Sequence, residues 1–306
     1  MFGFGEEVLI EDEFLRDGLQ NEARLLPFAD KVAFLRGLED AGLRRIQLGS
    51  FVNPARVPQM ADTDELFRTL ERKPGVTYTA LVLNMAGLER ALAVSVPHLS
   101  ISVSASETHS RANVGKSVDE ALAHITPVIE RALGVGVSVR AGIQSALGCG
   151  FEGRIAPERV VAIARVFSNL GVHEINLADT AGLANPRQVF ELVGAVRAAV
   201  RPDVGLSLHL HDTRGLGLAN MVAGLQAGVR IFDAALGGLG GCPFIPAASG
   251  NIATEDAVFA LEEMGVSTGI DWQALAALSR RLEAALGRGL PGRMAHVAAP
   301  PAAAMR

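Results

Sequence analysis

Two histidines separated by one residue carry the strongest chemical signal in this 306-residue chain. His209 and His211 end an apolar run and are followed directly by Asp212. Residues two positions apart on a strand point to the same side, so both imidazoles can face one point. Two imidazoles and a carboxylate from another segment form a site for a divalent metal. The alternative is a pair of partly buried histidines that only make hydrogen bonds, and the aspartate that follows favours the metal site.

Two other segments offer oxygen ligands for the same metal. Asp17 follows the first apolar run and stands beside Arg16, although an Arg–Asp pair alone is more typical of a surface salt bridge or a helix cap. Asn251 offers a side-chain carbonyl oxygen, but it also suits the N-cap of a helix that begins at Ile252. The residue types alone leave both alternatives open.

Two glycine-rich loops each contain a thiol. Cys242 ends the segment Gly-Gly-Leu-Gly-Gly-Cys, and Cys149 lies in a shorter loop of the same kind. Glycine lets the backbone approach a ligand closely, so a cysteine on such a loop is a candidate proton donor. Residue chemistry does not rank the two. Without a secretory signal we expect two free thiols in a cytoplasmic protein.

The segments around these residues predict a (β/α)8 TIM barrel of the α/β class, spanning residues 1–270. Short apolar runs alternate with amphipathic segments in units of about 30 residues, and barrel enzymes keep their sites at the C-terminal ends of the strands. An open doubly wound sheet would carry a glycine-rich turn after the first strand, but the segment 16–22 is charged and has one glycine. For residues 271–306 we expect a helix at 272–286 and a flexible tail. The predicted strands are 8–10, 45–47, 77–82, 99–103, 137–141, 174–177, 206–210 and 231–234, and the predicted barrel helices are 28–41, 63–72, 85–93, 118–133, 157–170, 186–200, 216–227 and 252–264.

Composition excludes several classes of partner. The net charge is −5 and no basic stripe is present, which argues against nucleic acid or an anionic membrane as partner. The N-terminus lacks the basic start and apolar run of a signal peptide, and no apolar stretch is long enough to span a bilayer. A hydrophobic content of 49% is enough for the large core that a barrel needs.

Several blocks of sequence, in order along the chain, resemble the 3-hydroxy-3-methylglutaryl-CoA lyase family of metal-dependent barrel enzymes. They cover most of the chain and lie at residues 16–22 (RDGLQNE), 50–54 (SFVNP), 57–60 (VPQM), 105–107 (ASE), 179–180 (DT), 209–212 (HLHD), 238–243 (GLGGCP) and 248–251 (ASGN).

The resemblance implies a role for each matching position. The family cleaves its acyl-CoA substrate into acetyl-CoA and acetoacetate, and its relatives suggest a homodimer. The matching metal ligands, for Mg²⁺ or Mn²⁺, are Asp17, His209, His211 and Asn251. Arg16 matches the arginine that stabilises the enolate oxygen, Cys242 the thiol that shuttles a proton, and Asp179 a carboxylate lining the site; Gln20, Gln47, Ser50 and Asn176 fall in the substrate pocket.

These residue types suit a retro-Claisen cleavage. A metal lowers the pKa of the substrate hydroxyl, and a guanidinium meets the oxygen of the thioester enolate. A thiol with a pKa near ~8.5 can protonate the enolate carbon. The base that accepts the hydroxyl proton is either His209 or Asp17, and the sequence does not choose between them.

The chain departs from the family at three positions: Gln47 replaces a glutamate, Asn176 a serine, and Leu15 a proline. The family glutamate pairs with the catalytic arginine, so we expect this pairing to be lost at Gln47, with Asp12 or Glu13 as candidates to compensate. The hypothesis is that the chemistry is retained while the choice of substrate is shifted or broadened.

Two other functions compete with the lyase. A metal-dependent 2-oxo acid aldolase shares the barrel and the histidine pair, but the Gly-Gly-Cys-Pro block favours the lyase. A catalytically weak barrel kept as a binding protein is supported by Gln47 and opposed by the complete set of metal ligands.

Overall fold

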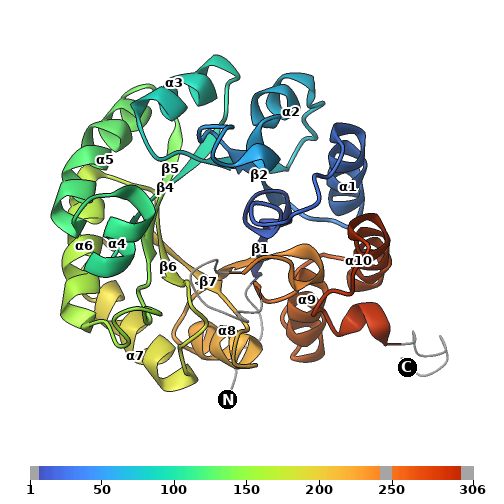
Figure 1. Cartoon of the computed structure of the whole chain (residues 1–306). Coiled ribbons are helices and arrows are strands. Elements are labelled where there is room, and N and C mark those ends of the chain that lie inside the picture. The colour runs from blue at the N-terminus through green and yellow to red at the C-terminus, as the bar shows by residue number, and fades with distance from the viewer. Residues whose placement is uncertain (1–6, 242–249, 298–306) are drawn as a thin grey trace.

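Eight parallel strands pair in chain order from β1 to β8, and β8 closes the ring by pairing with β1 (Figure 1). The computed structural model describes residues 7–241 and 250–297. The predicted (β/α)8 barrel is therefore confirmed. The strands are β1 (Leu9–Asp12), β2 (Arg45–Ser50), β3 (Thr77–Leu81), β4 (His98–Ser104), β5 (Ser138–Gln144), β6 (Glu174–Asp179), β7 (Gly205–Leu210) and β8 (Ile231–Ala234).

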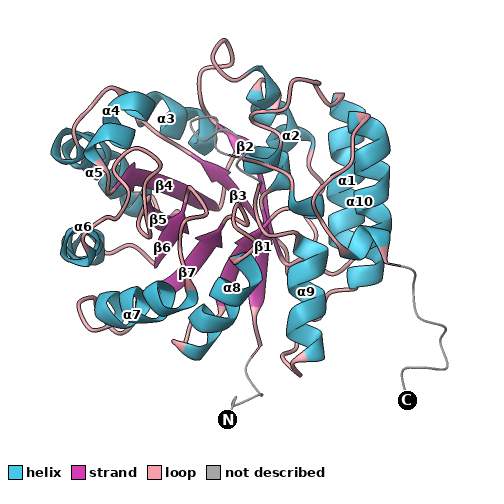
Figure 2. Cartoon of the chain, turned by 60° about the horizontal axis from the view of Figure 1, so that its bottom comes forward, coloured by secondary structure: helices cyan, strands magenta, loops and turns pink. Residues whose placement is uncertain are grey.

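Helices surround the strands on the outside of the ring (Figure 2). Each predicted helix is present, with ends that shift by up to a few residues. The helices are α1 (Phe28–Asp40), α2 (Thr63–Thr69), α3 (Met85–Ala93), α4 (Glu107–Val114), α5 (Val118–Gly134), α6 (Pro157–Leu170), α7 (Pro186–Arg197), α8 (Gly217–Gln226), α9 (Thr254–Glu263) and α10 (Trp272–Leu286).

Short 3-10 turns aside, two elements of the described segments were not predicted. Helix α4 is mostly polar and buries only His109 and Ser110, so it lacks the apolar periodicity of an amphipathic helix; it begins where the Ser106 side chain accepts a hydrogen bond from the backbone of His109. A π-helical turn spans Phe14–Gly18, directly after β1. Such turns are frequent at functional sites, and this one carries Arg16 and Asp17.

The two faces of the barrel wall differ in polarity. Residues such as Ile10, Ile46 and Phe232 are buried in the apolar layer of the core. Alternate positions on the same strands hold charged side chains, including Glu11 on β1 and Asp233 on β8, and these reach the same arginine on β5. Because side chains alternate along a strand, the apolar set packs under the helices and the polar set fills the barrel.

The last helix, α10, packs beside α1 and α9 (Figure 1). Leu275, Leu278 and Leu282 are buried in the main core, and the Asp271 side chain caps the helix start. The helix predicted at 272–286 is confirmed. Residues 298–306 of the predicted tail lie outside the described residues, and the domain boundary near residue 270 stays a prediction. None of the helices in the described segments has the length and apolarity to cross a membrane.

Candidate functional site

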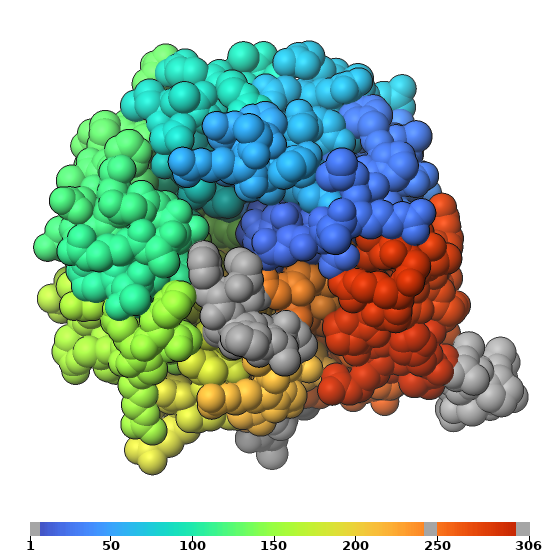
Figure 3. Space-filling model, viewed as in Figure 1, coloured from blue at the N-terminus to red at the C-terminus, as the bar shows by residue number. Residues whose placement is uncertain are grey.

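A cavity of about 300 Å³ opens at the C-terminal ends of the strands. The space-filling view shows this end hollowed near the middle of the ring, beside the N-terminal segment (Figure 3). Residues from β2, β4, β5, β6 and β7 and from the π-helical turn line the cavity. Seven of the predicted site residues are among them: Arg16, Asp17, Gln20, Ser50, Asn176, His209 and His211.

Three of these residues, Asp17, His209 and His211, bring together atoms that can bind one metal ion. We call these three residues the metal-binding group. Nε2 of His209 lies 3.1 Å from Nε2 of His211, and Oδ2 of Asp17 lies 3.9 Å and 3.6 Å from these two nitrogens. All three residues are buried. Donor atoms that bind one octahedral Mg²⁺ lie about 3 Å apart, so this spacing fits a single divalent cation.

Asn251 completes the group from the segment after β8. It pairs with His211 in an antiparallel bridge, and its Nδ2 donates to Oδ2 of Asp17 (2.8 Å) and to the carbonyl of Leu239 (3.0 Å). Its Oδ1 is buried without a hydrogen-bond partner among the described residues, which leaves that oxygen available to a cation. Because α9 begins at Thr254, the alternative that Asn251 caps a helix is wrong.

The chain passes very close to these ligands at Gly240. Its φ is +125°, and a Cβ there would lie 2.6 Å from Nδ2 of Asn251. Glycine is therefore required for the loop to cover the metal-binding group.

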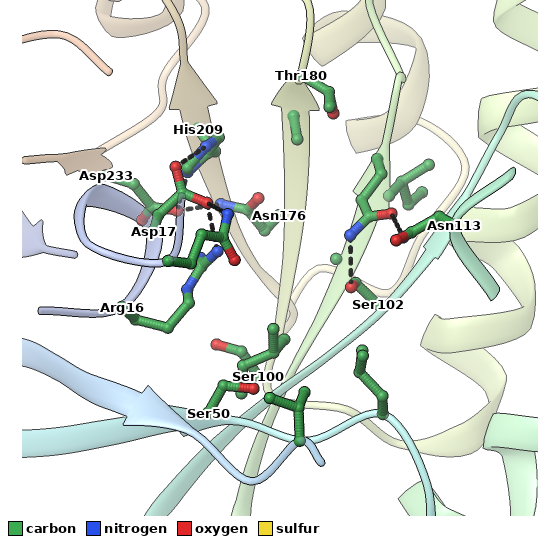
Figure 4. Close-up of a pocket in the computed structure, with 18 of the residues that line it drawn as sticks. Arg16, Asp17, Ser50, Ser100, Ser102, Asn113, Asn176, Thr180, His209 and Asp233 are labelled. Atoms are coloured by element: carbon green, nitrogen blue, oxygen red, sulfur yellow. Dashed lines mark hydrogen bonds and ion pairs between the residues drawn. The ribbon is translucent and has the colours of Figure 1, made fainter. Parts of the chain in front are cut away.

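His209 is oriented from behind by carboxylates. Its Nδ1 lies 3.2 Å from Oδ2 of Asp233 (Figure 4). The same nitrogen lies 3.5 Å from Oε2 of Glu13. Burial alone would lower the pKa of His209, but these hydrogen bonds and charges raise it to about 10. Without a cation the raised pKa keeps both ring nitrogens protonated. A bound cation would displace the proton on Nε2, while the proton on Nδ1 stays hydrogen-bonded to Asp233.

Arg16 is held on three sides. Its Nε donates to Oε1 of Gln47, its Nη2 pairs with Glu13, and its Nη1 pairs with Asp17. Burial opposes the charge, but Glu13 and Asp17 raise the pKa of Arg16 above its ordinary value. Leu15, the departure from the family proline, is buried in the core. A fixed guanidinium therefore lines the cavity next to the metal-binding group.

Gln47 cannot form the ion pair of the family glutamate, as expected, but it keeps a direct contact with Arg16. The amide oxygen keeps the hydrogen bond, and only the negative charge is missing. The Gln47 side chain is fully buried beneath Arg16 and does not line the cavity, so it supports the site from behind. Of the two candidates to compensate, Glu13 pairs with Arg16, whereas Asp12 accepts hydrogen bonds from Phe14 and Thr254.

Asp179 does not line the cavity either, which corrects its predicted place. Its two carboxylate oxygens accept backbone hydrogen bonds from Leu183 (2.9 Å) and Ala184 (3.1 Å). It therefore holds the loop after β6 in position. Of the two thiols, Cys242 lies outside the described residues, and Cys149 is buried and does not line the cavity.

The predicted substrate residues that do line the cavity have different surroundings. Gln20 donates to Asp17 (3.0 Å), and Asn176 donates to Asp233 (3.1 Å) and Ser207 (2.9 Å). The hydroxyl of Ser50 is buried without a partner in the described segments, so it can meet a substrate.

Sequence reasoning missed Arg140 and Asp233, which both line the cavity. Arg140 donates to Asp233 (2.7 Å) and to Ser100 (3.0 Å). A signal was present, because each charge interrupts an otherwise apolar strand, and a charge inside a buried strand requires a partner.

Comparison with known proteins places the chain in a family. The model of the HMGL-like family matches residues 7–282. Hydroxymethylglutaryl-CoA lyase of Pseudomonas mevalonii is 44% identical over 275 residues, which are 89% of this chain and 90% of that protein. (R)-citramalyl-CoA lyase of Chloroflexus aurantiacus is 45% identical over 296 residues, which are 94% and 93% of the two chains.

A solved structure shares the whole fold. The HMG-CoA lyase of Acinetobacter baumannii, in complex with coenzyme A and 3-methylmalate, superposes with a TM-score of 0.91 at 39% identity and covers 98% of this chain and 100% of that one. The family match over most of the chain and the closed barrel lead to one conclusion: this chain is a member of the HMGL-like family, among the relatives of the hydroxymethylglutaryl-CoA lyases.

Proposed function

We propose that this protein is a metal-dependent lyase that cleaves 3-hydroxy-3-methylglutaryl-CoA, or a close analogue, into acetyl-CoA and an oxo acid, which is acetoacetate for that substrate. One observation carries the proposal: the metal-binding group of Asp17, His209 and His211 lies beside the fixed guanidinium of Arg16 in one cavity. The family is metal-dependent, and we propose Mg²⁺ or Mn²⁺ as the ion because the donor set includes oxygens as well as imidazoles.

The bound cation would be held by Asp17, His209, His211 and Asn251, and it would lower the pKa of the substrate hydroxyl. The chain supplies the remaining chemistry. Arg16 meets the oxygen on which the thioester enolate develops its charge, and its three protein contacts hold it in place before the substrate arrives.

Asp17 is poorly suited to accept the hydroxyl proton. Burial raises the pKa of this carboxyl, but Arg16 and the two histidines hold it well below its ordinary value. Its oxygens also already accept from Gln20 and Asn251. These contacts argue against Asp17 as the base.

We propose Cys242 as the donor that protonates the enolate carbon. The residue directly before it, Gly241, lines the cavity. Replacing Cys242 by serine should slow product formation and leave metal binding unchanged.

A second substrate is favoured by the 45% identical relative, whose name gives (R)-citramalyl-CoA. The same cleavage of that thioester releases pyruvate in place of acetoacetate. Gln47 and Asn176, which replace family residues in and beneath the pocket, are consistent with an altered acyl group. The acyl-CoA class is common to both candidates, whereas the homodimer and the cytoplasmic location stay predictions.

The test is an assay of the purified protein on both thioesters, with Mn²⁺ or Mg²⁺ and with a chelator. Acetoacetate release identifies the first substrate and pyruvate release the second, and the chelator should abolish either. Asp17→Asn should abolish turnover, whereas the matched variant Asp30→Asn, at an exposed position on α1, should retain it. A metal-loaded protein that cleaves neither thioester would refute the proposal.

A further inference from the structure

The carboxylate of Glu13 lies between two arginines at the top of the barrel interior. It is fully buried, and its Oε2 pairs with Nη2 of Arg16 while its Oε1 accepts from Nη2 of Arg140 (2.6 Å). The amide of Gln47 also donates to Oε1 (3.1 Å). Glu13 does not line the cavity, so it can act on a substrate only through the cavity residues that it contacts, which are Arg16, Arg140 and His209.

Glu13 belongs to a chain of ion pairs, alternating in charge, that runs through the barrel interior to the metal-binding group. Arg45 pairs with Glu11 (2.6 Å), and Glu11 pairs with Arg140 (2.9 Å). Arg140 pairs with Glu13, Glu13 with Arg16, and Arg16 with Asp17 of the metal-binding group. Without Glu13, two buried guanidiniums would face each other with no anion between them, which is strongly unfavourable.

We propose that Glu13 is the positioning residue for Arg16. Glu13 directly follows β1 and supplies the anion that β2 lacks, because β2 carries the neutral Gln47. This inference rests on the proposed function in one respect: Arg16 must act in the reaction. Three contacts fix the guanidinium, and two of them are ionic. The ionic partners are Asp17 and Glu13. Asp17 belongs to the metal-binding group, so of these two contacts only the one with Glu13 holds Arg16 from inside the barrel.

The adjacency of the two side chains makes the inference testable by exchange. Because Gln47 and Glu13 lie 3.1 Å apart and both contact Arg16, a carboxylate at either position can reach it. Glu13→Gln removes the anion and keeps the shape. The double variant Glu13→Gln/Gln47→Glu returns the anion from β2 and restores the original net charge of the cluster.

The experiment measures kcat and KM of the two variants on whichever thioester the wild type cleaves. We expect Glu13→Gln to lower kcat about 100-fold, the order found when one preorganised charge-stabilising donor is lost, with KM nearly unchanged. The double variant should recover kcat to within about tenfold of wild type. Glu39→Gln, at a buried carboxylate that accepts from Tyr78 outside the barrel, is the matched control and should retain kcat.

Two results would overturn the inference: an unchanged kcat in Glu13→Gln, or a folded double variant no more active than Glu13→Gln. If Glu13→Gln does not fold, the double variant decides alone, since it should be both folded and active. If the wild type cleaves no thioester, the proposed function fails separately. Crystal structures then decide the role of Glu13, because Arg16 should leave Gln47 and Asp17 in Glu13→Gln and return in the double variant.

Discussion

The lower interior of the barrel and its mouth both bury charged side chains, yet their partners differ. In the interior, Arg45 pairs with Glu174 (2.8 Å) and Glu11, and Arg140 pairs with Glu11 and Asp233, all at 2.6–2.9 Å. At the mouth, His209 and His211 turn two nitrogens toward each other, and Oδ1 of Asn251 has no partner among the residues that the structure describes.

The charged side chains of the interior neutralise one another and support the fold. The mouth offers donor atoms that a ligand can bind. Burial opposes ionisation of Glu174, but Arg45 and Arg140 lower its pKa to about 2, so Glu174 stays ionised within a set of ion pairs that fills the interior. The mouth contains donor atoms that lie close enough together to bind one cation. Variants of the two regions should therefore fail in different ways.

The largest effect is expected from Arg140→Met, which breaks the interior set. It leaves Glu11, Glu13 and Asp233 without their shared cation. Removing one partner of a buried ion pair costs about 3–5 kcal/mol, so the free energy of unfolding in urea should fall by at least that amount. Arg131→Met, at a half-exposed arginine 3.5 Å from Glu89, should change it by under about 1 kcal/mol. Equal effects in the two variants would show that the interior pairs do not support the fold.

The next largest effect on stability is expected from Asp12, a buried carboxylate that pairs with no arginine among the described residues. Burial raises the pKa of Asp12 from 3.8 to about 7, although Thr254 and backbone hydrogen bonds oppose the shift. The folded state therefore binds more protons than the unfolded state between these values, and stability falls as pH rises through this window. The loss is about 4 kcal/mol at pH 8.

Asp12→Asn removes this dependence, so the variant should gain stability relative to wild type at pH 8 but not at pH 4. Urea unfolding at both pH values measures the difference. The same pH dependence in both proteins would show that Asp12 remains charged in the fold.

The smallest effect separates the mouth from the interior. A ligand that binds only the folded state stabilises it by about 2.7 kcal/mol at 100 times its Kd, so Mn²⁺ should raise the unfolding temperature of the wild type. His211→Ala should abolish this increase, because it removes Nε2, one of the proposed ligand atoms. The other ring nitrogen of His211, Nδ1, makes no hydrogen bond among the described residues. His296→Ala, at an exposed histidine, should preserve it. An increase that survives in His211→Ala would place the metal elsewhere.

The sequence predicted the barrel and the metal-binding group because both have local signatures. Apolar runs of strand length repeat between amphipathic helices, and His209 and His211 alternate on one strand, so periodicity alone locates them. Arg16 and Asp17 followed from the family resemblance, and the structure brings them to the same cavity.

The chain of ion pairs inside the barrel could not be predicted in the same way. Arg140 and Asp233 are 93 positions apart and meet only once the barrel closes. Whether Gln47 accepts a hydrogen bond from Arg16 depends on how β2 packs against the π-helical turn, which no local pattern encodes. Asp179 shows the opposite failure, since a motif match implied a place in the cavity but backbone donors of the following loop take both of its oxygens.

The most direct test of the account is the stoichiometry of Mn²⁺ binding, measured by titration of the metal-free protein with detection of free Mn²⁺ by electron paramagnetic resonance. We expect one tight site per chain in the wild type and in Glu39→Gln, and more than about 100-fold weaker binding in Asp17→Asn and His211→Ala. Tight binding that persists in both of these variants, or no tight site in the wild type, would contradict it.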